Sequence, residues 1–118
     1  MSVELPPAVA TYFASVMNHD WDALRACLAE DFERLGPYPE HIFPDPDGYV
    51  AFLAELLPTI ADHALTVDRS LTARDRCYVE ITERLSVDGT PKVSHLCLAF
   101  DLSPDGRLRR LTAYLRRT

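Results

Sequence analysis

The chain has 118 residues, enough for one domain with a buried core, and we treat residues 1–118 as a single domain. Its composition, 47% hydrophobic and 25% charged, is typical of a globular protein, and no apolar run is long enough to cross a bilayer. The formal net charge of -6 argues against nucleic acid as a partner, since phosphate binding needs clustered Lys and Arg. The first residues lack the basic and apolar regions of a signal peptide, so we expect a cytoplasmic protein with no membrane partner.

Two helices are expected at the start of the chain. Apolar residues recur at helical spacing from Pro6 or Pro7 to about Asn18, and proline is well tolerated in a first helical turn. Asp20 stands where an N-cap is expected for a second helix over residues 21–29. The two segments together predict a helical hairpin.

The helical pattern stops between Glu30 and Asp47, where prolines are concentrated. No regular helix survives this proline density, so we predict an irregular, partly stiffened loop. A loop of this length in a small domain is often functional. Asp47 is then expected to cap a third helix over residues 48–57, which has a broad apolar face.

The period of the pattern then changes from helical to alternating. We predict four strands over residues 64–73, 76–87, 92–102 and 107–116, with Asp or Asp-Gly at their connections. A helical half followed by a meander of strands predicts an α+β fold, in which the three helices pack on one face of a strongly curved antiparallel sheet. A sheet covered in this way leaves an apolar pocket between the two layers.

Two residues are expected to carry chemistry in this pocket. Alternation along residues 76–87 puts Glu83 on the apolar, inward face, where a partly desolvated carboxyl suits the role of general acid or base. The alternatives are a β-bulge that turns Glu83 outward, or a structural ion pair with Arg84 or Arg109. Tyr12 lies on the inward stripe of the first helix, where its phenol either donates to a ligand oxygen or only fills the core.

The other pocket residues are expected in the loop and on the inward faces of the elements. Tyr38 and His41, in the proline-rich loop, are expected to line or gate the pocket mouth. Apolar substrate-binding positions are expected at Phe13, Val79, Ile81, Leu98 and Leu111. The spacing of His41, Asp45 and Asp47 matches no specific metal site, and phosphate-loop, serine-hydrolase and zincin motifs are missing, so we expect no metal and no cofactor.

Several short segments share their order and spacing with a known superfamily. They are Ala10-Thr11-Tyr12-Phe13, Asn18-His19-Asp20-Trp21-Asp22-Ala23-Leu24, Leu28-Ala29-Glu30-Asp31-Phe32, and Asp105-Gly106-Arg107-Leu108 leading to Ala113-Tyr114. Together they resemble the nuclear transport factor 2-like superfamily, which includes ketosteroid isomerases, limonene epoxide hydrolases and SnoaL-like polyketide cyclases. The resemblance implies a cone of three helices on a strongly bent sheet, a deep apolar pocket, and dimerisation through the outer face of the sheet.

The catalytic residues of these relatives transfer only in part. In ketosteroid isomerases a tyrosine and an aspartic acid donate to the developing oxyanion, and a second aspartate moves the proton. By the resemblance, Tyr12 falls on that tyrosine, whereas Gly36 and Leu98 fall on the two aspartates. The epoxide hydrolases use an Asp-Arg-Asp arrangement, and here Ser86 and Ala113 stand where its acids belong.

Two hypotheses of function follow. The leading one is a small-molecule-binding protein that acts as an isomerase or cyclase on an apolar ring or carbonyl compound by acid/base catalysis, with Tyr12 polarising an oxygen and Glu83 moving a proton. The alternative is a non-catalytic ligand-binding or protein-interaction homodimer, since this kind of scaffold hosts unrelated functions. The important surface would then be the outer face of the sheet, with His95, Cys97, Ala99, Arg110, Thr112 and Tyr114.

Overall fold

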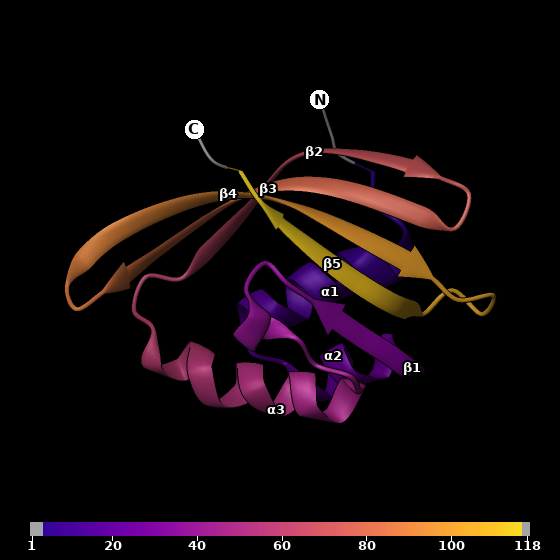
Figure 1. The fold of residues 1–118 in the computed structure, drawn as a ribbon, viewed down its shortest axis with the longest axis horizontal. Coiled ribbons are helices and arrows are strands. Elements are labelled where there is room, and N and C mark those ends of the chain that lie inside the picture. Colours follow the sequence, from indigo (N-terminus) through magenta and orange to yellow (C-terminus); the bar gives the residue numbers. More distant parts are fainter. Residues whose placement is uncertain (1–3, 117–118) are drawn as a thin grey trace.

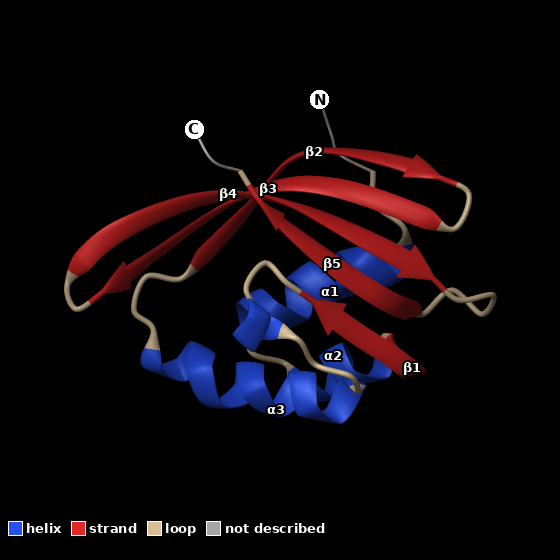
Figure 2. Cartoon of the chain, viewed as in Figure 1, coloured by secondary structure: helices blue, strands red, loops and turns tan. Residues whose placement is uncertain are grey.

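Three α-helices and a five-stranded sheet make up residues 4–116, the part of the chain that the computed structural model describes (Figure 1). In chain order the elements are α1 (Pro7–Asn18), α2 (Trp21–Ala26), β1 (Leu28–Leu35), η1 (Pro39–His41), α3 (Pro46–Leu56), η2 (Leu57–Thr59), β2 (Ala64–Ala73), β3 (Arg76–Val87), β4 (Thr90–Leu102) and β5 (Leu108–Leu115), where η marks a 3-10 turn. The helices lie together on one side of the sheet (Figure 2), so the predicted α+β class is confirmed. None of the helices within residues 4–116 has the length and apolar character needed to span a membrane.

The N-termini of α2 and α3 are capped by side chains just before them. Asp20 caps α2 as predicted, because its carboxylate accepts a backbone N–H three residues later. The predicted cap of the third helix at Asp47 is wrong: the backbone N–H of Gly48 donates to Asp45 Oδ1 at 2.6 Å. The helix can begin two residues earlier than expected because Pro46 occupies its first turn, where the missing N–H costs nothing.

Strand β1 lies where the sequence predicted the end of a helix and the start of a loop. The second helix stops at Ala26 rather than continuing through residues 21–29, and the loop predicted from Glu30 begins with a strand. Leu28 and Phe32 are both fully buried, and a spacing of four residues puts two side chains on one face of either a helix or a strand. Local pattern does not separate these states, so pairing with β5 decides between them.

The sheet has the strand order β1-β5-β4-β3-β2 and is mixed rather than purely antiparallel. β2 to β5 form an antiparallel meander, as predicted, whereas β1 pairs with β5 in parallel. The sheet bends around the helices without closing (Figure 1), and register irregularities in β2 and between β4 and β5 fall where bulges increase local bending. The prediction of an antiparallel sheet is therefore corrected for its β1 edge.

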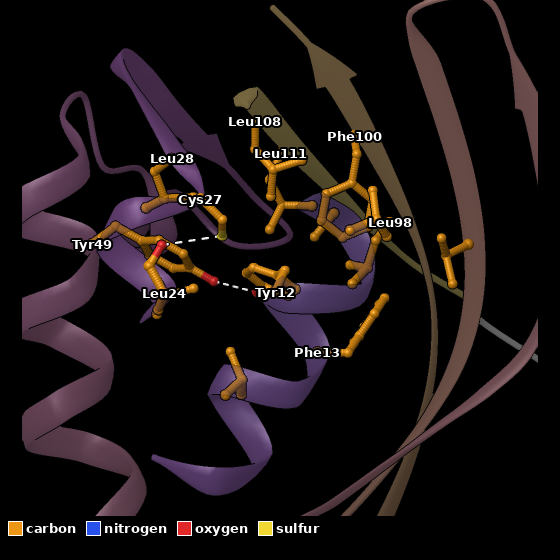
Figure 3. Close-up of a cluster of buried hydrophobic side chains, with 14 of the residues drawn as sticks. Tyr12, Phe13, Leu24, Cys27, Leu28, Tyr49, Leu98, Phe100, Leu108 and Leu111 are labelled. Atoms are coloured by element: carbon orange, nitrogen blue, oxygen red, sulfur yellow. Dashed lines mark hydrogen bonds between the residues drawn. The ribbon is translucent and has the colours of Figure 1, made fainter. Parts of the chain in front are cut away.

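The core fills the space between α1 and the concave face of the sheet. Phe100, on β4, is fully buried and makes edge-to-face contacts with Tyr12 and Phe13, at 5.3 and 5.8 Å between ring centroids (Figure 3). On β5, opposite it in the register, lies the fully buried Leu111. Alternation puts the other side chains of β4 and β5 on the outer face, which includes the pairs Cys97 with Tyr114 and Ala99 with Thr112. Association through that face stays a prediction.

Gly36, directly after β1, is the position where a side chain is least tolerated. Its φ is +77°, and a Cβ placed there would lie 2.8 Å from the carbonyl oxygen of Ala113. Gly89 has a similar φ of +79° but no atom within 4 Å of such a Cβ. Both Gly36→Ala and Gly89→Ala strain a left-handed backbone by about 1–2 kcal/mol, and only Gly36→Ala adds a steric clash.

We therefore expect Gly36→Ala to lower the free energy of unfolding by at least about 1 kcal/mol more than Gly89→Ala, on the scale typical of strain and overpacking. Urea denaturation of the two variants and the wild type measures this difference. Equal losses in the two variants would contradict the close approach of β1 and β5 at this point.

Candidate functional site

A cavity of about 230 Å³ lies between the helices and the concave face of the sheet. Its walls come from α1, α3, the segment around η1 and all five strands, and most of the lining side chains are apolar. For comparison, an engineered protein cavity of about 150 Å³ binds benzene, so this volume admits a ring compound. Five polar side chains that carry the chemistry below interrupt the apolar wall: Tyr12, Arg34, Tyr49, His63 and Glu83.

Two tyrosines and an arginine form a hydrogen-bonded chain in this cavity. α1 presents Tyr12 and α3 presents Tyr49, and their hydroxyl oxygens lie 2.6 Å apart (Figure 3). Arg34, near the end of β1, donates from Nη1 to the Tyr49 oxygen at 2.7 Å and from Nε to the carbonyl of Gly36 at 3.0 Å. The guanidinium also lies over the Tyr49 ring, 5.4 Å from its centroid. Arginine has only donors, so Tyr49 is the acceptor in this pair.

The charge states of this chain follow from its surroundings. Burial, and next the neighbouring Tyr49, raise the pKa of Tyr12 well above its ordinary value. Burial by itself would lower the pKa of Arg34, but the oxygens of Tyr49 and Tyr12 outweigh it and raise the pKa. At neutral pH Tyr12 is therefore a neutral hydrogen-bond donor, and Arg34 carries a full positive charge.

Glu83 reaches the same cavity from β3 and is held by a histidine. His63 Nε2 lies 2.9 Å from Glu83 Oε2, with side-chain exposures of 6% and 30% respectively. The histidine precedes β2, and since Leu65 lies opposite Glu83 in the β2–β3 register, residue 63 falls on the same face. Within the described residues the direct partner of Glu83 is thus His63, and the alternative of an ion pair with Arg84 or Arg109 is not formed.

Most of the site residues predicted from the sequence line the cavity. They are Tyr12, Tyr38, His41, Ile81, Glu83 and Leu98. The other three do not line it, because Phe13, Val79 and Leu111 are buried against other core side chains. Periodicity identifies the inward face of an element, but it does not tell which inward residue meets a cavity and which meets another side chain.

The predicted loop residues lie together at one side of the cavity. The rings of Tyr38 and His41 contact each other edge to face at 5.4 Å, and His41 also lies 5.8 Å from Phe52 of α3. The two acids near His41 have other partners: Asp45 caps α3, and Asp47 accepts from Arg25 Nε at 2.8 Å. Within residues 4–116, no three metal-binding side chains come together in a group that could hold an ion.

Sequence reasoning missed Arg34, Tyr49 and His63. The signal for Arg34 was its spacing of two from the buried Phe32, which puts both on one face of a strand, but the segment was interpreted as a loop. Tyr49 stands four residues before Leu53 on the apolar face of α3. His63 had no local signal, since only the β2–β3 register brings it to Glu83.

Comparisons with known proteins agree with this architecture. A family model described as a SnoaL-like domain matches residues 9–111. Among solved structures, an LEH-like epoxide hydrolase of M. tuberculosis has a TM-score of 0.81 at 17% identity, with 94% of this chain and 81% of that chain covered. A protein with a ketosteroid isomerase-like fold from Catenulispora acidiphila, in complex with trimethylamine, gives 0.82 at 15% identity, with 94% and 86% covered.

A third similar structure is an NTF2-like protein of unknown function from Burkholderia pseudomallei, with a TM-score of 0.79 at 20% identity and coverage of 92% of this chain and 88% of that one. No match was found among curated proteins. At these identities, the solved structures establish a shared fold and leave the chemistry to be argued from the residues of the cavity.

Proposed function

The chain belongs to the SnoaL-like domain family of the nuclear transport factor 2-like superfamily, and on that premise we propose that its cavity binds a small apolar ring or carbonyl compound and isomerises or cyclises it by acid/base catalysis. One observation carries this proposal. A neutral phenol donor, Tyr12, and a carboxylate, Glu83, come from different elements into a single apolar cavity. Such a pair fits the transfer of a proton next to a carbonyl group.

Tyr12 would polarise the carbonyl oxygen of the ligand. Arg34 donates to Tyr49, and if Tyr49 in turn donates to Tyr12, the Tyr12 proton is left free for a ligand oxygen. Hydrogen bonds in such a chain polarise one another, so the charge of Arg34 strengthens the donor at its far end. As the ligand loses a carbon-bound proton, its oxygen gains negative charge. The hydrogen bond from Tyr12 therefore stabilises the transition state more than the bound substrate.

Glu83 would accept the proton from carbon and return it at another position. His63 hydrogen-bonds to Oε2 of Glu83, which orients the carboxylate and leaves its other oxygen for the ligand. We assign this role to Glu83 because the positions of the acids in related enzymes are occupied by other residues. Gly36 has no room for a side chain. Leu98 and Ala113 have no polar side-chain group, and the Ser86 hydroxyl lacks the carboxylate needed to act as a base.

The test measures the rate at which the protein exchanges the α-hydrogens of ketones for deuterium. A panel of cyclic ketones is incubated with the protein in D₂O, and the exchange is monitored by NMR. We expect the wild type to catalyse exchange and Tyr12→Phe to slow it by about 10²–10³-fold, the effect typical of losing one oxyanion donor. The matched control is Tyr114→Phe, since Tyr114 is 58% exposed on the outer face. Exchange at the wild-type rate in Tyr12→Phe would contradict the role of this phenol.

The alternative function is a non-catalytic ligand-binding or interaction homodimer, and the outer face of the sheet favours it. Leu71 and Tyr78 lie opposite each other in the β2–β3 register and are 68% and 37% exposed, and Tyr114 adds a third large exposed side chain on that face. Exposed apolar side chains gathered on one face are typical of an interaction surface. Ligand binding without any exchange in the wild type would favour this alternative over catalysis.

A further inference from the structure

We propose that the cavity selects ligands in which an apolar ring carries a carboxylate, and that Arg34 is the counter-ion of this group. This inference rests on the proposed function in one respect, since both place the ligand in the same cavity. It adds the chemical class of the ligand, which the superfamily fold leaves open.

Arg34 differs from the other arginines of residues 4–116 in being half-buried without making an ion pair. Four further arginines of this part of the chain make no ion pair, but all four are exposed: Arg74, Arg84, Arg109 and Arg116. Ion pairs with Asp or Glu within residues 4–116 are made by Arg25, Arg69, Arg76, Arg107 and Arg110. Arg34 is half-buried, lines the cavity and makes none of the ion pairs of this part of the chain. Among the arginines without an ion pair, Arg34 thus has the most to gain from a carboxylate, because a desolvated charge without an acidic partner is costly.

The hydrogen bonds of Arg34 leave donors for a ligand. Its partners are neutral groups, the carbonyl of Gly36 and the hydroxyl of Tyr49. A guanidinium has five N–H bonds in a planar fork that matches the two oxygens of a carboxylate, and these two contacts use two of the five. The ring of Tyr49 under the guanidinium fixes its plane without supplying a negative charge.

Glu83, the acidic side chain of the cavity, acts on Arg34 without contacting it directly. Burial by itself lowers the pKa of Arg34, and the charge of Glu83 contributes to its net rise, after the larger effects of Tyr49 and Tyr12. The direct partner of Glu83 is His63, and no ion pair within residues 4–116 joins Glu83 to Arg34. A carboxylate at Arg34 would therefore supply the direct ion pair that Glu83 does not make, without displacing an existing contact.

The apolar side chains beside Arg34 indicate the shape and polarity of the rest of the ligand. Phe43 and Phe52 lie 4.7 Å apart between ring centroids, and Phe43 also packs against Tyr49 at 5.6 Å. Aromatic side chains at these distances form a surface suited to the face or edge of a further ring. A carboxylate attached to one ring or to two fused rings satisfies both the charge and this wall.

The test compares two probes of nearly equal shape, 2-naphthoate and the uncharged 2-naphthamide, by isothermal titration calorimetry. We expect the wild type to bind 2-naphthoate at least tenfold more tightly than the amide. Arg34→Met should remove this preference, Arg34→Lys should keep part of it, and Arg84→Met, which changes an exposed arginine of β3, should leave it unchanged. If Arg34→Met does not fold, the wild type and Arg34→Lys decide the result.

Equal affinities for the two probes, tighter binding of the amide, no binding of either, or a preference that survives in Arg34→Met would each overturn the inference. The proposed function fails on a different measurement, the ketone exchange. If naphthoate binding depends on Arg34 but the protein has no exchange activity, the anion site is supported and the proposed catalysis is refuted. If the protein catalyses exchange but shows no preference for the carboxylate, the catalysis is supported and the anion site is refuted.

Discussion

Glu83→Gln is expected to slow the exchange of ketone α-hydrogens by about 10²–10⁴-fold, the range typical of a lost general base. The amide has the shape of the carboxyl group but cannot accept a proton from carbon. It can still hydrogen-bond to His63, so the wall of the cavity should be preserved. Ligand binding should change much less than the rate, and rate and affinity are both measured on the same ketone by NMR.

The matched control is Glu80→Gln, three residues earlier on the same strand. Glu80 faces the outer side of β3, where it pairs with Arg69 instead of lining the cavity. This variant removes the same charge from the same element and should exchange at the wild-type rate. Exchange in Glu83→Gln at the wild-type rate would mean that another group, with His63 as the nearest, moves the proton.

Phe100→Ala is expected to lower the free energy of unfolding by about 3–5 kcal/mol, the cost typical of truncating a fully buried phenylalanine. A domain of this size is stable by about 5–15 kcal/mol in total, so the loss is a large part of its stability. The Phe100 ring contacts Tyr12 and Phe13, and its loss leaves a void between α1 and β4. Guanidinium denaturation followed by circular dichroism measures the effect.

The control for this substitution is Leu71→Ala. Leu71 is 68% exposed on the edge strand β2, and truncating such a side chain normally changes stability by no more than about 0.5 kcal/mol. A loss below about 1 kcal/mol in Phe100→Ala would contradict the central place of this ring in the core. Since Tyr12 rests on Phe100, we also expect the variant to bind ligands more weakly.

The chain has the fold of the superfamily, but the polar side chains of its cavity come from positions other than those that the resemblance implies for the acids. Tyr12 lines the cavity, in agreement with the place that the superfamily resemblance implies for it. The resemblance puts one acid at Gly36, where an added side chain would clash with the Ala113 carbonyl. In the function that we propose, the proton is moved by Glu83, which lies on the same inward face as Ile81. One fold can thus present different acid and base groups, because almost every inward position of its strands faces the cavity or the core.

The sequence by itself determined the helical half, the four-strand meander and the inward placement of two candidate catalytic side chains. These features depend on the spacing of apolar residues within each helix or strand. Tyr12 follows the 3.6-residue repeat of α1, and Glu83 follows strict alternation along β3. The same reasoning failed for β1, because the spacing of Leu28 and Phe32 suits a helix as well as a strand.

Only the tertiary structure decided which polar groups meet. Tyr12 and Tyr49 are 37 positions apart in the chain, and His63 and Glu83 are 20 apart. Their contacts depend on how α3 packs over the sheet and on the register of β2 with β3, which no local pattern specifies. The lack of an ion pair at the half-buried Arg34 also depends on tertiary structure, because it is defined only once the positions of all neighbouring side chains are known.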